Sequence, residues 1–259
     1  MKLAVLVHPD RQEAKELAER LRAQAGGFDI EIVDELAADL DGVIAVGGDG
    51  TMLEALNQAM PLGLAVAGIN MGHIGYLAEV PPVRLEEAVE RIASGKTSVE
   101  ERLTTTARWS GGELTGVNDV VVEKIESQHA VRLQVDIDGE RLVTYRADGV
   151  IVATPTGSTA YSFSAGGPIV PSGLDALVLT AVAAHNLFSR PVVLPADATI
   201  RFEVMGHRSA RVNVDGRECA VLGPGSVLEV SRGALVAKFL RVFPNGFAAT
   251  VREKFGFED

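Results

Sequence analysis

Five consecutive residues, Gly-Gly-Asp-Gly-Thr at positions 47–51, combine the backbone freedom of glycine with one carboxylate. Apolar residues 43–46 precede them and segment 52–56 follows, which predicts a strand, a tight turn and a helix start. Backbone N–H groups at a helix start favour a phosphate, and glycine lets it approach closely. The carboxylate would repel phosphate, so we expect Asp49 to do chemistry beside the phosphates or to hold a metal ion. The expected phosphate loop consists of Gly47, Gly48, Gly50 and Thr51.

A second group of chemically suggestive residues lies between positions 148 and 162. There an apolar strand runs into the loop Thr-Pro-Thr-Gly-Ser-Thr-Ala-Tyr-Ser, which is rich in small hydroxyl side chains. Such a loop offers hydrogen-bond donors and acceptors without bulk, which suits a sugar or a base edge, and Tyr161 can lie against a flat ring. Asn118 and Asp119 precede the apolar run 120–122, and this amide–carboxylate pair suits ribose hydroxyls or an adenine edge.

The first hundred residues alternate between predicted strands and helices. We expect strands at 3–7, 30–33, 43–46 and 64–67 and helices at 12–25, 52–60 and 85–93. This alternation is typical of a doubly wound α/β domain with a parallel sheet. Ligands bind such sheets beyond the carboxyl ends of the strands, which is where residues 47–51 fall.

After Lys96 the pattern changes to alternation with period two. Asp-Gly pairs at 138–139 and 215–216 separate alternating segments, and this is a strong hairpin signal. The second half therefore predicts an all-β sandwich, with one helix at 174–184 and a strand at 234–242. We expect an α/β domain at 1–98 and a β-sandwich domain at 99–245, with the segment 246–259 packing back on the first domain.

Composition excludes several classes of function. The chain of 259 residues has a net charge of −11 and no cluster of basic residues, which argues against a nucleic-acid surface. Cys219 is its one cysteine, which is compatible with a reducing compartment. The apolar start, residues 3–7, is too short for a signal or membrane-spanning segment. We therefore expect a cytoplasmic protein with no membrane and no nucleic-acid partner.

Taken together, these motifs resemble the NAD kinase family over nearly the whole chain. The resemblance rests on the Gly-Gly-Asp-Gly-Thr run, residues 70–77, Asn118 with Asp119, residues 148–171 and residues 189–191. The first run alone is not specific, because lipid kinases and, in variant form, phosphofructokinases have similar loops. Residues 154–162 together with 165–168 narrow the resemblance to NAD kinases.

The resemblance implies phosphorylation of the 2′-hydroxyl of the adenosine ribose of NAD by ATP or another donor such as polyphosphate, giving NADP. It makes Asp49 the catalytic base, lets Gly50 hold phosphates, and lets Asn118 contact NAD. The family usually has Glu where this chain has Asp119, a contact that a small shift or a water could preserve. The other implied dinucleotide-binding residues are His129, Arg146, Asp148, Thr159, Ala160, Tyr161, Ser162, Phe163, Ser164, Ala183 and Arg217.

The loop sequence predicts the cofactor, and the resemblance to NAD kinases predicts the assembly. The 47–51 loop has no P-loop lysine, so we expect a divalent ion, Mg²⁺, to bridge the donor phosphates, with no protein metal ligand assigned. The histidines His8, His73, His185 and His207 lack metal-ligand spacing and are interpreted as structural. The resemblance also implies a homodimer or homotetramer.

Other interpretations stay open at this point. The same loop could serve a lipid kinase, although no membrane-docking segment is evident, or an NAD(H)-binding sensor without activity. A dehydrogenase is disfavoured because no G-x-G-x-x-G follows the first strand. Among the site residues, Asn118 and Asp119 could merely form a turn, and His129, Arg146 and Arg217 could be surface residues.

Overall fold

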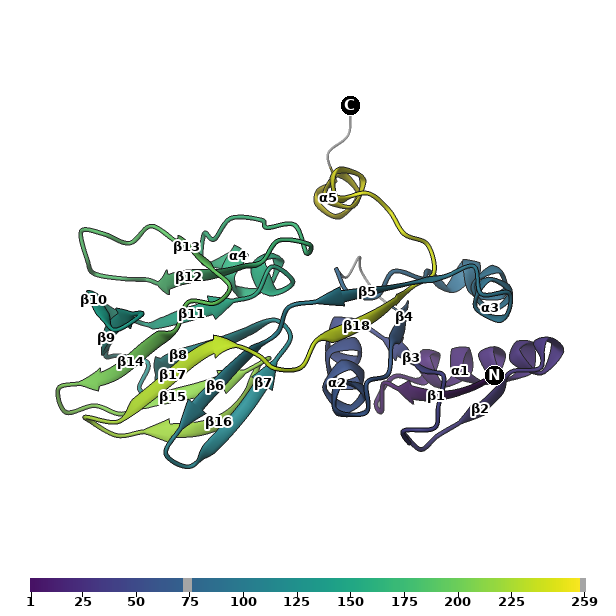
Figure 1. Cartoon of the computed structure of the whole chain (residues 1–259), viewed down its shortest axis with the longest axis horizontal. Coiled ribbons are helices and arrows are strands. Elements are labelled where there is room, and N and C mark those ends of the chain that lie inside the picture. Colours follow the sequence, from purple (N-terminus) through teal and green to yellow (C-terminus); the bar gives the residue numbers. More distant parts are fainter. Residues whose placement is uncertain (72–75, 257–259) are drawn as a thin grey trace. The chain divides into compact units, whose positions relative to one another are not determined.

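The computed structural model describes residues 1–71 and 76–256 of the chain, so His73 and the middle of the 70–77 motif lie outside the described residues. The chain forms two compact units (Figure 1). One comprises Met1–Glu101 with Ala237–Asp259, and the other comprises Arg102–Val236. None of the helices in the described ranges is both long enough and apolar enough to cross a membrane.

The first unit is built on a six-stranded sheet with the order β2-β1-β3-β4-β18-β5. Its strands β1 to β4 pair in parallel, as does β18 with β4. This confirms the parallel sheet predicted from the alternating pattern. The strand bounds are Lys2–Val7 (β1), Glu31–Val33 (β2), Gly42–Gly47 (β3), Val66–Asn70 (β4), Ser98–Arg102 (β5) and Ala237–Arg241 (β18).

Helices cover both faces of this sheet. Helices α1 (Gln12–Ala25) and α3 (Leu85–Ala93) share one buried cluster with sheet residues that include Ala67. The next residue, Gly68, faces the other way, and a Cβ there would lie 3.0 Å from Met52 Sδ of α2 (Asp49–Ala59). Helix α2 therefore packs on the face opposite α1 and α3, which confirms the doubly wound arrangement.

The prediction that strand 234–242 belongs to the β-rich half is wrong. Strand β18 lies beside β4 in the first sheet, where Phe239 pairs with Val66 (Figure 1). The Arg241 side chain bonds to Glu79 at 2.7 Å and also to Glu100, both in the same unit. The alternation of the strand fits either sheet, and its partner lies far away along the chain, so periodicity could not choose between them.

The second unit contains two six-stranded sheets, in the orders β10-β9-β14-β17-β6-β7 and β13-β12-β11-β8-β15-β16. Alternate residues of both sheets, among them Leu133 and Phe202 of the first and Val122 and Val152 of the second, form one buried cluster. This confirms the predicted β-sandwich. The strand bounds are Thr105–Trp109 (β6), Gly112–Gly116 (β7), Asp119–Lys124 (β8), Val131–Ile137 (β9), Glu140–Ala147 (β10), Gly149–Ala153 (β11), Ala176–Val182 (β12), Val192–Pro195 (β13), Ile200–Met205 (β14), Ala210–Val214 (β15), Arg217–Leu222 (β16) and Val227–Arg232 (β17).

The predicted helix at 174–184 is wrong, because the segment forms strand β12 between β11 and β13. The second sheet is buried on both faces: Val121, Ile151 and Val178 form a further cluster on the side away from the main core. A strand buried on both faces is apolar throughout and lacks the two-residue alternation. The β-branched residues of the segment were the better signal.

Candidate active site and dinucleotide site

The 47–51 loop joins β3 to α2 in the first unit. Helix α2 begins at Asp49, three residues before the predicted start, with extended Gly48 as its N-cap and no side chain capping it. The first N–H groups of a helix have no partner within it, so those of this turn are available to an anion. A Cβ on Gly47 would lie 2.2 Å from Thr51 Oγ1, so this close turn requires glycine.

The carboxylate of Asp49 is held in place by backbone N–H groups. Tyr76 N–H donates to Oδ2 at 2.8 Å, while Leu77 and Ala78 N–H donate to Oδ1 at 3.1 and 3.4 Å. A carboxylate has about four acceptor positions, so Asp49 keeps capacity for a further hydrogen bond from a ligand hydroxyl. Apart from the motif at 70–77, no sequence pattern indicated these donors.

The C-terminal helix α5 (Phe247–Phe255) belongs to the first unit, as expected for the segment after 246. Its Phe255 ring lies 5.7 Å from the Tyr76 ring, centroid to centroid, next to the segment that holds Asp49. Burial lowers the pKa of Lys254, and the charges of Glu253, Asp49 and Glu79 oppose this effect. The helix thus brings an ammonium group within electrostatic reach of Asp49, which sequence reasoning missed.

In the second unit, Asn118 and Asp119 form the turn that opens β8. The carboxylate of Asp215 accepts three consecutive N–H groups, from Val117 at 2.9 Å, Asn118 at 2.7 Å and Asp119 at 3.3 Å. The Asp119 side chain is buried, and its pKa is raised to about 7, first by burial and then by the charge of Asp215. Asp215 was missed as a site residue and was noted only as part of a hairpin turn.

The structure brings the 154–162 loop against the Asn118 turn. Thr154 N–H donates to the Asn118 carbonyl at 2.9 Å, and Thr154 Oγ1 donates to the Val117 carbonyl at 2.6 Å. A Cβ on Gly157 would lie 2.0 Å from the Asn118 oxygen, so the two backbones touch. Asn118 Oδ1 and Thr156 Oγ1 are buried without a hydrogen-bond partner among the described residues. A water molecule or a bound ligand would supply the hydrogen bonds that these two atoms lack.

The aromatic residues that follow are partly exposed. Tyr161 and Phe163 of helix α4 (Tyr161–Ser164) are 41% and 39% exposed, and the exposed part of the Tyr161 ring is accessible to a ligand. Burial raises the pKa of Tyr161, and the charges of Glu123, Asp148 and Asp119 add to it. Tyr161 is therefore within electrostatic reach of both predicted carboxylates. The Ser162 hydroxyl, by contrast, is buried and bonds to Thr180 Oγ1 at 2.9 Å.

The remaining candidates lie on strand ends and loops of the second unit. Asp148 and Ala183 lie at the opposite end of β11 from Asn118, because Gly149 pairs with Glu123 and Val182 whereas Ala153 pairs with Asp119. Asp148 bonds to Lys124 at 2.7 Å, and Lys124 also lines a hollow of about 450 Å³ together with exposed His129. Ala183, just after β12, has a φ of 47°, a left-handed backbone that is uncommon for alanine. The other placements are Arg146 exposed in β10, Arg217 exposed at the start of β16, Thr159 at the end of the short 3₁₀ turn Gly157–Thr159, and Ala160 and Ser164 at either end of α4.

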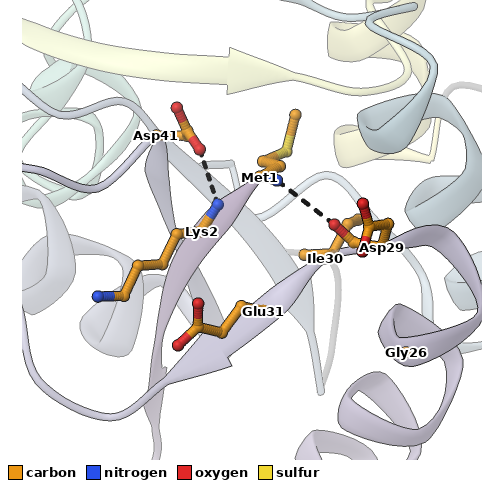
Figure 2. A pocket seen from close by; sticks show the side chains of 7 residues that line it. All are labelled: Met1, Lys2, Gly26, Asp29, Ile30, Glu31 and Asp41. Carbon is orange, nitrogen blue, oxygen red and sulfur yellow. Dashed lines mark hydrogen bonds between the residues drawn. The ribbon is translucent and has the colours of Figure 1, made fainter.

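A separate hollow lies at the start of β1 and β2, lined by Lys2, Glu31 and Asp41 among others (Figure 2). Lys2 N–H donates there to Asp41 at 2.7 Å. This is the amino end of parallel strands, opposite to the end at which such sheets bind ligands. In the described part of the chain, no three His, Cys, Asp or Glu side chains converge as a metal site.

Comparisons with known proteins agree with this geometry. Residues 30–97 match the family described as ATP-NAD kinase N-terminal domain, and residues 117–242 match the ATP-NAD kinase C-terminal domain. The chain is 37% identical to the NAD kinase of Moorella thermoacetica, over 92% of this chain and 78% of the relative. It is 36% identical to the NAD kinase of Heliobacterium modesticaldum, over 97% of each chain.

Two solved structures share the fold. Yeast NADH kinase complexed with NADH matches with a TM-score of 0.86 and 22% identity, over 99% of this chain and 88% of that one. An NAD kinase from Archaeoglobus fulgidus in complex with ATP matches with a TM-score of 0.81 and 24% identity, over 98% and 99% of the two chains.

Proposed function

The chain belongs to the NAD kinase family and phosphorylates NAD to give NADP, and from this premise we propose that Asp49 is the general base of the transfer. The 2′-oxygen of the adenosine ribose attacks the terminal phosphorus of the donor while the bond from that phosphorus to the leaving oxygen breaks. The hydroxyl proton passes to Asp49. The observation that supports this role is the fixed carboxylate, which the N–H groups of residues 76–78 orient and which can accept a further hydrogen bond.

We propose that the N–H groups at the start of α2 hold donor or dinucleotide phosphates, with ATP as the donor. The uncapped first turn supports this assignment, because it presents N–H donors and the positive end of the helix dipole. Because the N-cap residue is Gly48, no side chain at that position covers these donors. The Archaeoglobus fulgidus relative was solved with ATP, which favours the same donor here.

We propose that NAD lies against the second unit through Asn118, Asp119 and the 154–162 loop. The unpartnered Asn118 Oδ1 and Thr156 Oγ1 support this placement, because a bound ribose or base would supply the missing hydrogen bonds. Tyr161 offers a ring face near Asp119 and Asp148. Asp148, His129, Arg146, Ala183 and Arg217 are proposed to line the same site.

We propose that Mg²⁺ is the cofactor. Proteins bind Mg²⁺ through one or two carboxylates together with substrate phosphates and water. The described residues offer no cluster of three ligands, so the ion would be held mainly by the donor phosphates, and Asp49 is the carboxylate that the proposed phosphate loop itself carries. When bound, the ion neutralises phosphate charge; orientation of the hydroxyl and acceptance of its proton remain the work of Asp49.

The test is an assay of purified protein with NAD, ATP and Mg²⁺, in which NADP is detected by an NADP-specific dehydrogenase. Substitution of polyphosphate for ATP measures the donor range. We expect NADP to form with ATP, and we expect Asp49→Asn to lose nearly all turnover, a fall of about 10² to 10⁴-fold, while NAD binding persists. If that variant turns over at a near-normal rate, the base assignment is wrong.

We also propose a homo-oligomer, a dimer or tetramer, in the cytoplasm. Apolar side chains that are more than half exposed in the second unit support association through that unit; they are Leu174, Leu187, Val193 and Val221. Light scattering of the purified protein measures the mass: twice or four times the chain mass supports the proposal, and the mass of one chain overturns it.

A further inference from the structure

The two Asp-Gly hairpin turns of the second unit have the same backbone but different hydrogen bonds. Asp138 and Asp215 both have left-handed backbone, with φ of 51° and 49°, and a glycine of positive φ follows each. Asp138 Oδ1 accepts one N–H, from Thr199 at 2.8 Å. Asp215 accepts the three consecutive N–H groups of residues 117–119. The hairpin geometry does not require these three hydrogen bonds. We therefore interpret the Asp215 carboxylate as a support for residues 117–119.

That segment is held from its other side as well. The carbonyl oxygens of Val117 and Asn118 accept hydrogen bonds from Thr154, and Gly157 fits against the Asn118 oxygen. The N–H groups of residues 117–119 therefore donate to Asp215, and the carbonyl oxygens of Val117 and Asn118 accept from Thr154. With the backbone fixed on both sides, the Asn118 side chain keeps a buried oxygen without a partner among the described residues.

A preorganised polar group is worth more to a ligand than a mobile one, because less ordering is needed on binding. A carboxylate that accepts backbone N–H groups makes charge-assisted hydrogen bonds, which are stronger than neutral ones. The three bonds at 2.7 to 3.3 Å thus provide a rigid base for the Asn118 and Asp119 side chains.

We propose that Asp215 is a positioning residue for the dinucleotide, which fixes the 117–119 turn so that the Asn118 amide meets a ribose or adenine edge. The inference rests on the proposed function, in which Asn118 and Asp119 contact NAD. Asp215 itself touches no reacting atom in this role. Its effect is on the binding of NAD and not on that of the phosphoryl donor.

The two Asp-Gly turns provide a test variant, Asp215→Asn, and a matched control, Asp138→Asn. Asp215→Asn keeps the size of the side chain but offers one acceptor oxygen in place of two, so at least one of the three bonds is lost. We expect KM for NAD to rise at least tenfold, with kcat and KM for ATP within twofold of the wild-type values. Asp138→Asn makes the same change in the other turn and should leave all three constants within twofold.

Two results overturn the proposal: a KM for NAD within twofold of wild type in Asp215→Asn, or an equal rise in both variants. Asn118→Ala, measured alongside, separates this inference from the proposed site. Weaker NAD binding in Asn118→Ala but not in Asp215→Asn refutes only the role of Asp215. Unchanged NAD binding in Asn118→Ala refutes the site and, with it, this inference.

A measurement on the wild-type protein keeps the proposal testable if Asp215→Asn folds poorly. Amide hydrogen exchange in the absence of NAD reports the hydrogen bonds of Val117 and Asn118 directly. We expect both amides to be protected at the level of the flanking strand β8. Exchange at the rate of an exposed loop would show that the turn is not preorganised and would contradict the proposal.

Discussion

The buried carboxyl of Asp119 predicts an unusual dependence of stability on pH. Its pKa is raised from the ordinary 3.8 to about 7 by burial and by Asp215. The folded state therefore binds a proton between about pH 4 and pH 7 that the unfolded state has released. Stability is highest below the unfolded pKa, falls as pH rises, and the loss is complete once pH passes the folded pKa near 7.

The size of the effect follows from the two pKa values. A difference of one pKa unit corresponds to about 1.4 kcal/mol, so the full loss is about 4 kcal/mol, of which about 2–3 kcal/mol falls between pH 5 and pH 8. Asn at position 119 cannot ionise. We therefore expect the unfolding free energy of the wild-type protein to fall by about 2–3 kcal/mol more than that of Asp119→Asn between pH 5 and pH 8.

Urea unfolding measures this difference at several pH values. Trp109, the one tryptophan of the chain, lies in the same unit as Asp119, so its fluorescence reports the unit of interest. Carboxyl groups that do not interact with Asp119 titrate equally in both proteins, and the comparison removes their contribution. Parallel stability curves for the wild type and Asp119→Asn from pH 5 to pH 8 would show that the pKa of Asp119 is not raised by folding.

Three further outcomes are expected. Gly157→Ala should lower the unfolding free energy by about 1–3 kcal/mol and weaken NAD binding, because its Cβ would lie 2.0 Å from the Asn118 carbonyl oxygen. Gly173→Ala is the control, because a Cβ there meets nothing within 4 Å, and it should change neither quantity. Removal of divalent ions with EDTA should stop turnover but leave NAD binding intact, and added Mg²⁺ should restore the rate; turnover that survives EDTA would contradict the cofactor proposal. Arg241→Met should destabilise the first unit by about 3 kcal/mol, because it leaves Glu79 and Glu100 without their cation; urea unfolding that matches the wild type would contradict this.

Local sequence patterns were enough to predict much of the fold. The strand–turn–helix at 43–56 could be predicted because an apolar run, three glycines and an apolar periodic segment follow one another. Both Asp-Gly hairpins could be predicted from turn chemistry alone. These signals are local, since the residues that cause the structure are neighbours in sequence.

The errors all involve non-local pairing or burial. Strand β18 pairs with β4, about 170 residues earlier in the chain, and strand β12 is buried on both faces. For the site, the Gly-Gly-Asp-Gly-Thr run identified Asp49, but nothing local showed that residues 76–78 hold it. Asp215 illustrates the same limit: its turn was evident, whereas its hydrogen bonds to residues 117–119 arise only when β15 pairs with β8.

In the proposed mechanism, Asp49 takes the proton from the attacking hydroxyl. In Asp49→Asn the side chain keeps one oxygen for the N–H groups of residues 76–78, and the loss of one such bond costs about 1–3 kcal/mol, which is less than the stability typical of a folded protein. The fold and the NAD site should therefore remain.

The most direct measurement is the single-turnover rate of phosphoryl transfer in Asp49→Asn, with the Kd for NAD measured on the same sample. Loss of a general base lowers a rate by about 10² to 10⁴-fold. We predict a fall in that range with the Kd for NAD within about threefold of wild type. A transfer rate within tenfold of the wild-type rate would contradict the account.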